Sequence, residues 1–235
     1  MKSKIKFHSK GNDFFKGELE KKEKKILNFL NLYSIYLFQK NPLFREAILK
    51  QEKNTLNTAD GFVVSKYLRT KKIRGTDFTI NVLKHIKDRK HFFLGADGAS
   101  EEGVKKIVRK FSLNPKKTFY YNPPYIKSLR FPKEEVEKII KIINSKKPDY
   151  LWIGLGNPKQ EIMAHDLFDR IKVKKIFNVG GAIDFLTGSK KQAPHFWKLI
   201  GFEWIYRFLT DFKYSRKKVF RSFIGLFYLP VSVTK

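Results

Sequence analysis

The stretch PDYLWIGLGNPKQE, residues 148–161, decides the fold class of this chain. Its apolar run at 149–153 predicts a buried strand, and Gly154 and Gly156 predict a tight turn directly after that strand. Residues 161–170 then predict a helix, and Pro158 suits the first turn of that helix. A buried strand that passes through glycines into a helix is typical of a βα unit in a parallel sheet.

The same pattern recurs on both sides of this stretch. Apolar or β-prone runs predict strands at 34–38, 91–94, 118–121 and 175–179, and helical spacing predicts helices at 42–50, 100–111 and 133–144. Two of these strands end on glycines, at Gly95 and at Gly180-Gly181. We therefore predict an α/β, Rossmann-like fold with a mostly parallel sheet and helices on both faces. In such sheets ligands bind at the carboxyl ends of the strands.

The βα alternation stops near residue 190, where an aromatic, basic and helical pattern replaces it. We predict an α/β core at 1–189, which includes a basic N-terminal extension at 1–30, and a C-terminal appendage at 190–235. No run reaches the ~20 apolar residues that a membrane-spanning helix needs, and the charged N-terminus does not resemble a signal peptide.

The end of the chain combines charge with apolar residues. The uncharged run 222–234 follows a basic cluster, Lys213, Arg216, Lys217, Lys218 and Arg221. Aromatic and aliphatic residues beside Lys and Arg suit a segment that lies in a membrane interface. The alternative is a terminal helix packed on the core.

The composition narrows the classes of protein. Lys and Arg number 50 and Asp and Glu 22, so the net charge is +28, yet 42% of the residues are hydrophobic, which excludes a disordered polycation. The absence of cysteine excludes a disulfide scaffold and a thiolate zinc site. The charge predicts a polyanionic partner, which is nucleic acid, an anionic membrane surface or a phosphorylated ligand. General lysine enrichment is the alternative explanation.

Polar residues at the predicted strand ends are candidate site residues. Free N–H groups where the 154–161 loop enters its helix favour phosphate. Gln160 and Glu161 would hold sugar hydroxyls or a base edge, or would cap the helix. A tight turn without a ligand is the alternative for this loop.

Three further residues at these ends carry charge. Asp60, in TADGF (58–62), is a candidate general base or an ordinary turn aspartate. Arg74, before Gly75, is a candidate phosphate clamp. Asp184, which follows Gly180 and Gly181, is a hydrogen-bond partner of a ligand or a helix cap. The sequence has no DxD, HExxH, P-loop or GxSxG motif, and its five histidines lack ligand spacing, so we expect no metal and no cofactor.

An ordered set of stretches also carries a family resemblance. These are TADGFVV (58–64), RGTDF (74–78), HFFLGADGASEEGV (91–104), PDYLWIGLGNPKQE (148–161), NVGGAIDFLTG (178–188) and QAPHFWKLIGFEWIYRF (192–208). Together they resemble the WecG/TagA/CpsF family of bacterial glycosyltransferases, glycosyltransferase family 26, over residues 34–221.

The resemblance implies an inverting, metal-independent enzyme. Such enzymes move a sugar, commonly N-acetylmannosamine, from a UDP donor to a polyprenyl-diphosphate-linked sugar for cell-wall or surface polysaccharides. They work at the cytoplasmic face of the bacterial plasma membrane as peripheral proteins, and some self-associate. The resemblance makes Asp60 the base, places Arg74 near the donor, and assigns substrate-binding roles to Lys159, Gln160 and Glu161.

The resemblance also points to residues outside the core motifs. Arg207, Arg216 and Arg221 become candidates for the lipid diphosphate. Members often carry Thr-x-Asn at the end of the first strand, and the expected match is Gln39-Lys40-Asn41, which makes Asn41 a candidate substrate-binding residue. The usual Arg-Ala-Pro reads Gln192-Ala193-Pro194. These departures leave the donor sugar and the acceptor open.

Two rival hypotheses stay open beside the transferase. A basic nucleic-acid-binding protein would explain the net charge, and its DNA or RNA binding would survive physiological salt. A degenerate family member would bind a UDP-sugar without turnover, as the departures at Gln39 and Gln192 allow.

Overall fold

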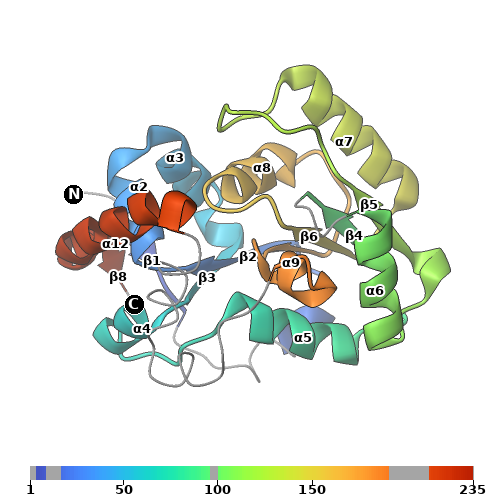
Figure 1. Cartoon of the computed structure of the whole chain (residues 1–235), viewed down its shortest axis with the longest axis horizontal. Helices are drawn as coiled ribbons and strands as arrows, with labels where there is room; N and C mark the ends of the chain where they lie inside the picture. Colours follow the sequence, from blue (N-terminus) through green and yellow to red (C-terminus); the bar gives the residue numbers. More distant parts are fainter. Residues whose placement is uncertain (1–3, 9–16, 96–99, 191–211, 235) are drawn as a thin grey trace.

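A six-stranded parallel sheet forms the centre of the molecule (Figure 1). The computed structural model describes residues 4–8, 17–95, 100–190 and 212–234. The strand order is β3-β2-β7-β6-β4-β5, and every neighbouring pair runs parallel. The strands are β2 (Lys25–Leu30), β3 (Thr55–Ala59), β4 (His91–Leu94), β5 (Thr118–Tyr121), β6 (Tyr150–Ile153) and β7 (Lys175–Asn178). The predicted α/β fold is confirmed.

Helices cover both faces of this sheet. On one face Phe93, Trp152 and Phe177 pack against α5 (Gly75–His85), α6 (Glu101–Phe111) and α9 (Ala182–Thr187). On the other face their strand neighbours Phe92, Leu151 and Ile176 pack against α7 (Lys133–Lys146) and α8 (Lys159–Phe168). Because side chains alternate along a strand, runs that are apolar throughout feed both cores at once.

The first strand of the sheet differs from the prediction. The run at 34–38 is helical and lies within α2 (Leu32–Lys40), so the strand predicted there is wrong. Asn31 begins this helix: its side chain accepts from the backbone N–H of Ser34, and the Ser34 hydroxyl accepts from the backbone N–H of Asn31. This capping box outweighs the β-propensity of the Tyr and Ile residues that follow.

The strand itself lies earlier in the chain. β2 spans residues that the sequence placed in the basic N-terminal extension at 1–30, so the core begins before residue 30. Flanking lysines and the polar Asn28 hide the apolar character of KILNFL. Asn31 rather than Asn41 therefore stands at the end of the first core strand. Asn41 lies at the junction of α2 with α3 (Pro42–Lys50), where its side chain accepts from the backbone N–H of Phe44.

The C-terminal segment packs on the core. Helix α12 (Phe212–Ser232) lies along α2 (Figure 1), and β8 (Val233–Thr234) pairs in parallel with β1 (Ile5–Lys6). A Cβ at Gly225 would lie 2.1 Å from the backbone oxygen of Leu32, so only glycine permits this approach. With α4 (Phe62–Tyr67), these elements share a third apolar core.

Two expectations about this segment have different outcomes. The described part of the C-terminal segment packs against α2, and its contact with a membrane interface stays a prediction; within the described ranges no helix is long and apolar enough to cross a membrane. The division of the chain at residue 190 stays a prediction. Arg207 and Gln192 lie outside the described residues.

Candidate functional site

The carboxyl ends of the strands bring most of the predicted site residues to one edge of the sheet. Asp60 directly follows β3, and its backbone N–H donates to Leu30 O at the end of β2, 2.8 Å away. The half-buried Asp60 precedes Gly61, whose φ of 117° is open only to glycine, and Asn31 lies beside that glycine. One strand, β2, lies between β3 and β7, so two strand spacings, about 10 Å, separate Asp60 from the end of β7.

The loop between β6 and α8 closes over the same edge. Gly156 takes a φ of 78°, and its carbonyl accepts from the backbone N–H of Gln160 as the helix starts. Gly154, buried at the end of β6, donates its N–H to Leu94 O. Asn157 Nδ2 donates to Ser34 Oγ over 2.9 Å, which ties this loop to the start of α2.

Gln160 and Glu161 form the buried centre of the site. They are 4% and 2% exposed. Gln160 Nε2 donates to Glu161 Oε1 over 2.8 Å and to the backbone oxygen of Asn178 over 3.2 Å. Gln160 Oε1 and Glu161 Oε2 are buried without a hydrogen-bond partner. The pair therefore joins the start of α8 to the end of β7 rather than merely capping its own helix.

Burial raises the pKa of Glu161 to about 7, because an apolar interior disfavours the carboxylate. The hydrogen bond from Gln160 and the positive charge of Lys218 act in the opposite direction but do not cancel this effect. A carboxyl group with a pKa near neutrality at a ligand edge is typical of functional sites.

Arg74 approaches the same edge at the start of α5, the second helix after β3. It is the N-cap residue of α5, and a Cβ on the adjacent Gly75 would lie 3.5 Å from Phe29 and 3.7 Å from Val179 O. Gly180, with a φ of 54°, and Gly181 come directly after Val179. The Arg74 side chain forms an ion pair with Asp77 over 3.3 Å.

Other predicted site residues make contacts elsewhere. Lys159 Nζ donates to Ile126 O and lies over the Tyr125 ring, and burial lowers the pKa of Lys159. Asp184 is buried and pairs with Lys190 over 2.6 Å. Asn41 lies at the far end of α2, about 14 Å from the edge where Asn31 begins that helix. Their binding roles stay predictions.

Two of the predicted arginines lie on α12. The Arg221 guanidinium stacks over Tyr36 of α2, and Arg216 is exposed. Their proposed role toward a lipid diphosphate stays a prediction as well.

The structure adds residues that sequence reasoning missed. Asn178 is the last residue of β7 and contacts Gln160 through its backbone oxygen, and Asn31 follows β2 and caps α2. Lys218 Nζ lies over the Tyr33 ring of α2, and its positive charge acts to lower the pKa of Glu161. The sequence pattern places Lys218 in the basic cluster that suits a membrane interface. The motif NVGG marks the position of Asn178, but only the β2–β7 pairing reveals its partners.

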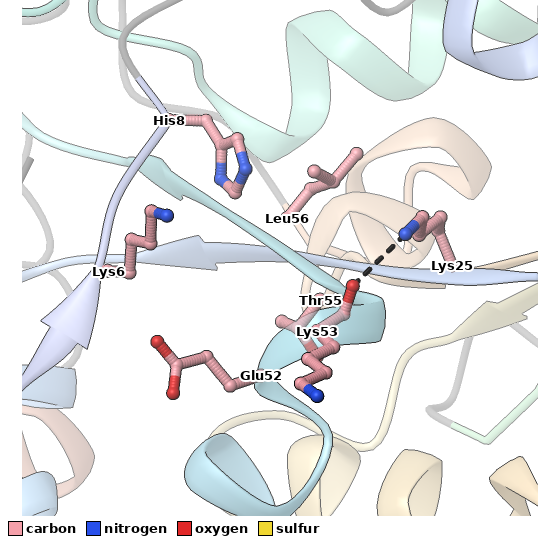
Figure 2. A pocket seen from close by; sticks show the side chains of 7 residues that line it. All are labelled: Lys6, His8, Lys25, Glu52, Lys53, Thr55 and Leu56. Carbon is pink, nitrogen blue, oxygen red and sulfur yellow. Dashed lines mark hydrogen bonds between the residues drawn. The ribbon is translucent and has the colours of Figure 1, made fainter.

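A hollow lies at the opposite end of the sheet from the candidate site. Figure 2 shows this cavity of about 340 Å³ at the amino ends of β2 and β3. Its lining residues are Lys6, His8, Lys25, Glu52, Lys53, Thr55 and Leu56. Lys25 Nζ donates to Lys53 O across it, and the hollow shares no residue with the edge that carries Asp60. In the described part of the chain, no cluster of three or more His, Asp or Glu residues could hold a metal ion.

A parallel sheet with glycine turns and buried polar groups at one carboxyl edge defines the class: a Rossmann-like α/β protein, a class in which ligands bind at the carboxyl ends of the strands. Comparison with known proteins identifies the family. The model of the glycosyl transferase WecG/TagA/CpsF family matches residues 9–233, so the chain belongs to that family of glycosyltransferases. The predicted resemblance is confirmed.

Curated relatives come from Staphylococcus aureus. The chain is 34% identical, over 146 residues, to N-acetylglucosaminyldiphosphoundecaprenol N-acetyl-beta-D-mannosaminyltransferase of strain MRSA252. It is 33% identical to the protein of the same name in strain NCTC 8325 / PS 47. Each match covers 60% of this chain and 54% of the relative, so the chain spans about half the length of the curated relatives it matches.

Proposed function

We propose that this chain is an inverting, metal-independent glycosyltransferase that moves N-acetylmannosamine from UDP to a polyprenyl-diphosphate-linked sugar. The carrying observation is the family match over residues 9–233, together with a half-buried Asp60 at the carboxyl edge of the sheet. The names of the relatives supply the sugar and the lipid-linked acceptor. The products would serve cell-wall or surface polysaccharides.

The proposed reaction needs one base and one departing group. The Asp60 carboxylate takes the proton of the acceptor hydroxyl as that oxygen attacks the anomeric carbon. The bond from this carbon to the UDP oxygen breaks on the opposite face, and UDP leaves with the bonding electrons. Attack opposite the leaving group inverts the anomeric centre. Arg74, on the same edge, would offset the growing negative charge on the diphosphate.

The test is a transfer assay with the purified chain. UDP-N-acetylmannosamine and other UDP-sugars are offered with a polyprenyl-diphosphate-GlcNAc acceptor, with and without a chelator. Transfer that persists in the chelator is the expected result. A chain that binds UDP-sugars without releasing UDP would instead be a degenerate member, and one that transfers nothing but binds DNA or RNA at physiological salt would be a nucleic-acid-binding protein.

We further propose that α12 holds the protein at an anionic membrane surface. Gly225, Leu229 and Ser232 of this helix are buried, whereas Phe220, Phe223 and Phe227 on the other side are exposed, Phe227 by 80%. The exposed basic residues Arg216, Lys217 and Arg221 precede or interleave with them. Exposed aromatics beside cations suit the headgroup region of an anionic bilayer.

Vesicle sedimentation tests this attachment. We expect the chain to pellet with phosphatidylglycerol vesicles more than with phosphatidylcholine vesicles, and the double change Phe223→Ser, Phe227→Ser to abolish pelleting. Tyr125→Ser is the matched control, because Tyr125 is an 87% exposed aromatic residue outside α12. Equal pelleting of all three proteins would contradict the proposal.

A further inference from the structure

Unpaired buried acceptors gather at the ends of β6 and β7. Buried side-chain acceptors without a hydrogen-bond partner are Asn157 Oδ1, Gln160 Oε1, Glu161 Oε2 and Asn178 Oδ1. The side-chain amide nitrogens of Asn157, Gln160 and Asn178, in contrast, all donate to protein atoms. An unpaired buried acceptor costs about 1–3 kcal/mol, so the cluster points to a ligand group that donates hydrogen bonds.

Glu161 determines how the Gln160 amide is turned. Gln160 Nε2 lies between two acceptors, Glu161 Oε1 and the backbone oxygen of Asn178. If the amide were reversed, its oxygen would face both acceptors with no hydrogen between them. Gln160 Oε1 therefore lies on the side of Gly180, where a Cβ would come within 3.2 Å of it.

Asn178 is turned by a ladder of asparagines across three strands. The backbone oxygen of Lys6, which can only accept, accepts a hydrogen bond from Asn57 Nδ2 over 3.0 Å. Asn57 Oδ1 then receives Asn28 Nδ2 over 2.9 Å, and Asn28 Oδ1 receives Asn178 Nδ2 over 2.7 Å. The backbone carbonyl at one end sets the direction of every link, so Asn178 must present Oδ1 at the other end.

We propose that Glu161 is a positioning residue that turns Gln160 so that this end of the site offers acceptors and recognises hydroxyl or acetamido N–H groups of the donor sugar. The inference deepens the proposed function and rests on it. A phosphate does not suit this place, because its oxygens are also acceptors and would meet Gln160 Oε1 and Asn178 Oδ1 with no proton between them. Arg74 remains the candidate for the diphosphate.

Calorimetric titration of the full chain separates sugar recognition from nucleotide recognition. The probes are UDP, UDP-N-acetylmannosamine and UDP-N-acetylglucosamine. Glu161→Met keeps the volume but removes the acceptor that holds Gln160. We expect this variant to bind the better UDP-sugar about tenfold more weakly, which corresponds to one buried hydrogen bond, while its Kd for UDP stays unchanged. Glu161→Gln is the matched comparison, because its side-chain oxygen still accepts from Gln160 Nε2, and it should keep more UDP-sugar affinity than Glu161→Met.

Thermal unfolding first shows whether each variant is folded. If Glu161→Met is not, Gln160→Met provides the same test with the same expected loss. The inference is wrong if UDP and the UDP-sugar weaken equally, if Glu161→Gln loses as much as Glu161→Met, or if no variant loses affinity. Wild-type protein that binds a UDP-sugar while every folded variant keeps its affinity contradicts the inference alone, whereas a wild type that binds UDP but no UDP-sugar, or none of the three probes, contradicts the proposed function too.

Discussion

Two buried polar clusters lie on opposite faces of the same sheet. They differ in whether each buried polar side-chain atom has a hydrogen-bond partner. On the α5–α6–α9 face, His91 Nε2 bonds to Ile86 O over 3.0 Å and His91 Nδ1 accepts from Trp152 Nε1 over 3.2 Å. On the α8 face, Gln160 and Glu161 are just as buried, yet each keeps one oxygen unpaired. A fully paired network stabilises the fold, whereas a network with unpaired acceptors at a strand end can bind hydrogen-bond donors of a ligand.

Burial disfavours the charged form in both clusters, but with opposite consequences for pH. It lowers the pKa of His91 to about 4 and raises the pKa of Glu161 to about 7. The His91 contribution to stability is present above its ordinary pKa of 6.5 and is lost as the pH falls toward 4. The Glu161 contribution is present below 4.5 and is lost as the pH rises through about 7.

The largest expected effect lies at the open edge and concerns rate. Asp60→Asn should lower the transfer rate about 10²–10⁴-fold, because the amide cannot take the acceptor proton. UDP affinity and unfolding free energy should stay close to wild type, since Asp60 is only half-buried and the change preserves its shape. Single-turnover kinetics measure the transfer rate, UDP titration the affinity and urea unfolding the free energy. An unchanged rate would remove Asp60 from the role of base.

The next effect concerns the closed cluster and stability alone. His91→Phe leaves Trp152 Nε1–H and Ile86 O buried and unpaired, so we expect a loss of about 3 kcal/mol in unfolding free energy. Urea unfolding measures the loss, and the transfer rate per folded molecule should not change. A rate loss at unchanged stability would erase the contrast between the two clusters.

A smaller effect separates the clusters by pH. Glu161→Gln removes the buried ionisable group, so relative to wild type the variant should gain about 2 kcal/mol of stability between pH 5 and pH 9. Below pH 6 the acid destabilisation that His91 causes should be the same in both proteins. Urea midpoints along a pH series test this. Parallel curves of stability against pH for the two proteins would show that folding does not raise the pKa of Glu161.

The smallest effect belongs to a polar pair that is not buried. Arg130 binds both carboxylate oxygens of Asp166 on α8, each over 3.1 Å, but the arginine side chain is 42% exposed. Arg130→Ala should cost less than about 1 kcal/mol and leave transfer unchanged. A larger loss of unfolding free energy, measured by urea unfolding, would show that burial does not determine how much polar contacts on this helix stabilise the protein.

Local patterns located four of the six strands of the central sheet and missed β2 and β3. The runs at 91–94 and 118–121 match β4 and β5 residue for residue, and the run at 149–153 differs from β6 only by its first residue. These runs are short, apolar or β-prone and bounded by charged residues, glycine or asparagine, so propensity and burial agree. They disagree at 34–38, where the side-chain bonds of Asn31 and Ser34 start a helix in a β-prone stretch.

The site was only partly visible in the sequence. Gln160, Glu161 and Gly180 were predicted from loops that follow strands, and the structure brings them together. Asn178 was not predicted, because an asparagine at the end of a strand has no distinctive local pattern. Lys218 was placed with residues facing lipid, since helical spacing alone does not say which side of α12 meets α2.

The sequence by itself determined the βα units, the glycine turns and the family, because each depends on the local order of apolar, small and polar residues. Only the tertiary structure decided the strand order, the asparagine ladder and the docking of α12. Asn28, Asn57 and Asn178 lie far apart in the chain and meet through the register of three parallel strands. That register follows from the packing of whole elements on the two faces of the sheet, a non-local effect that no single stretch of sequence contains.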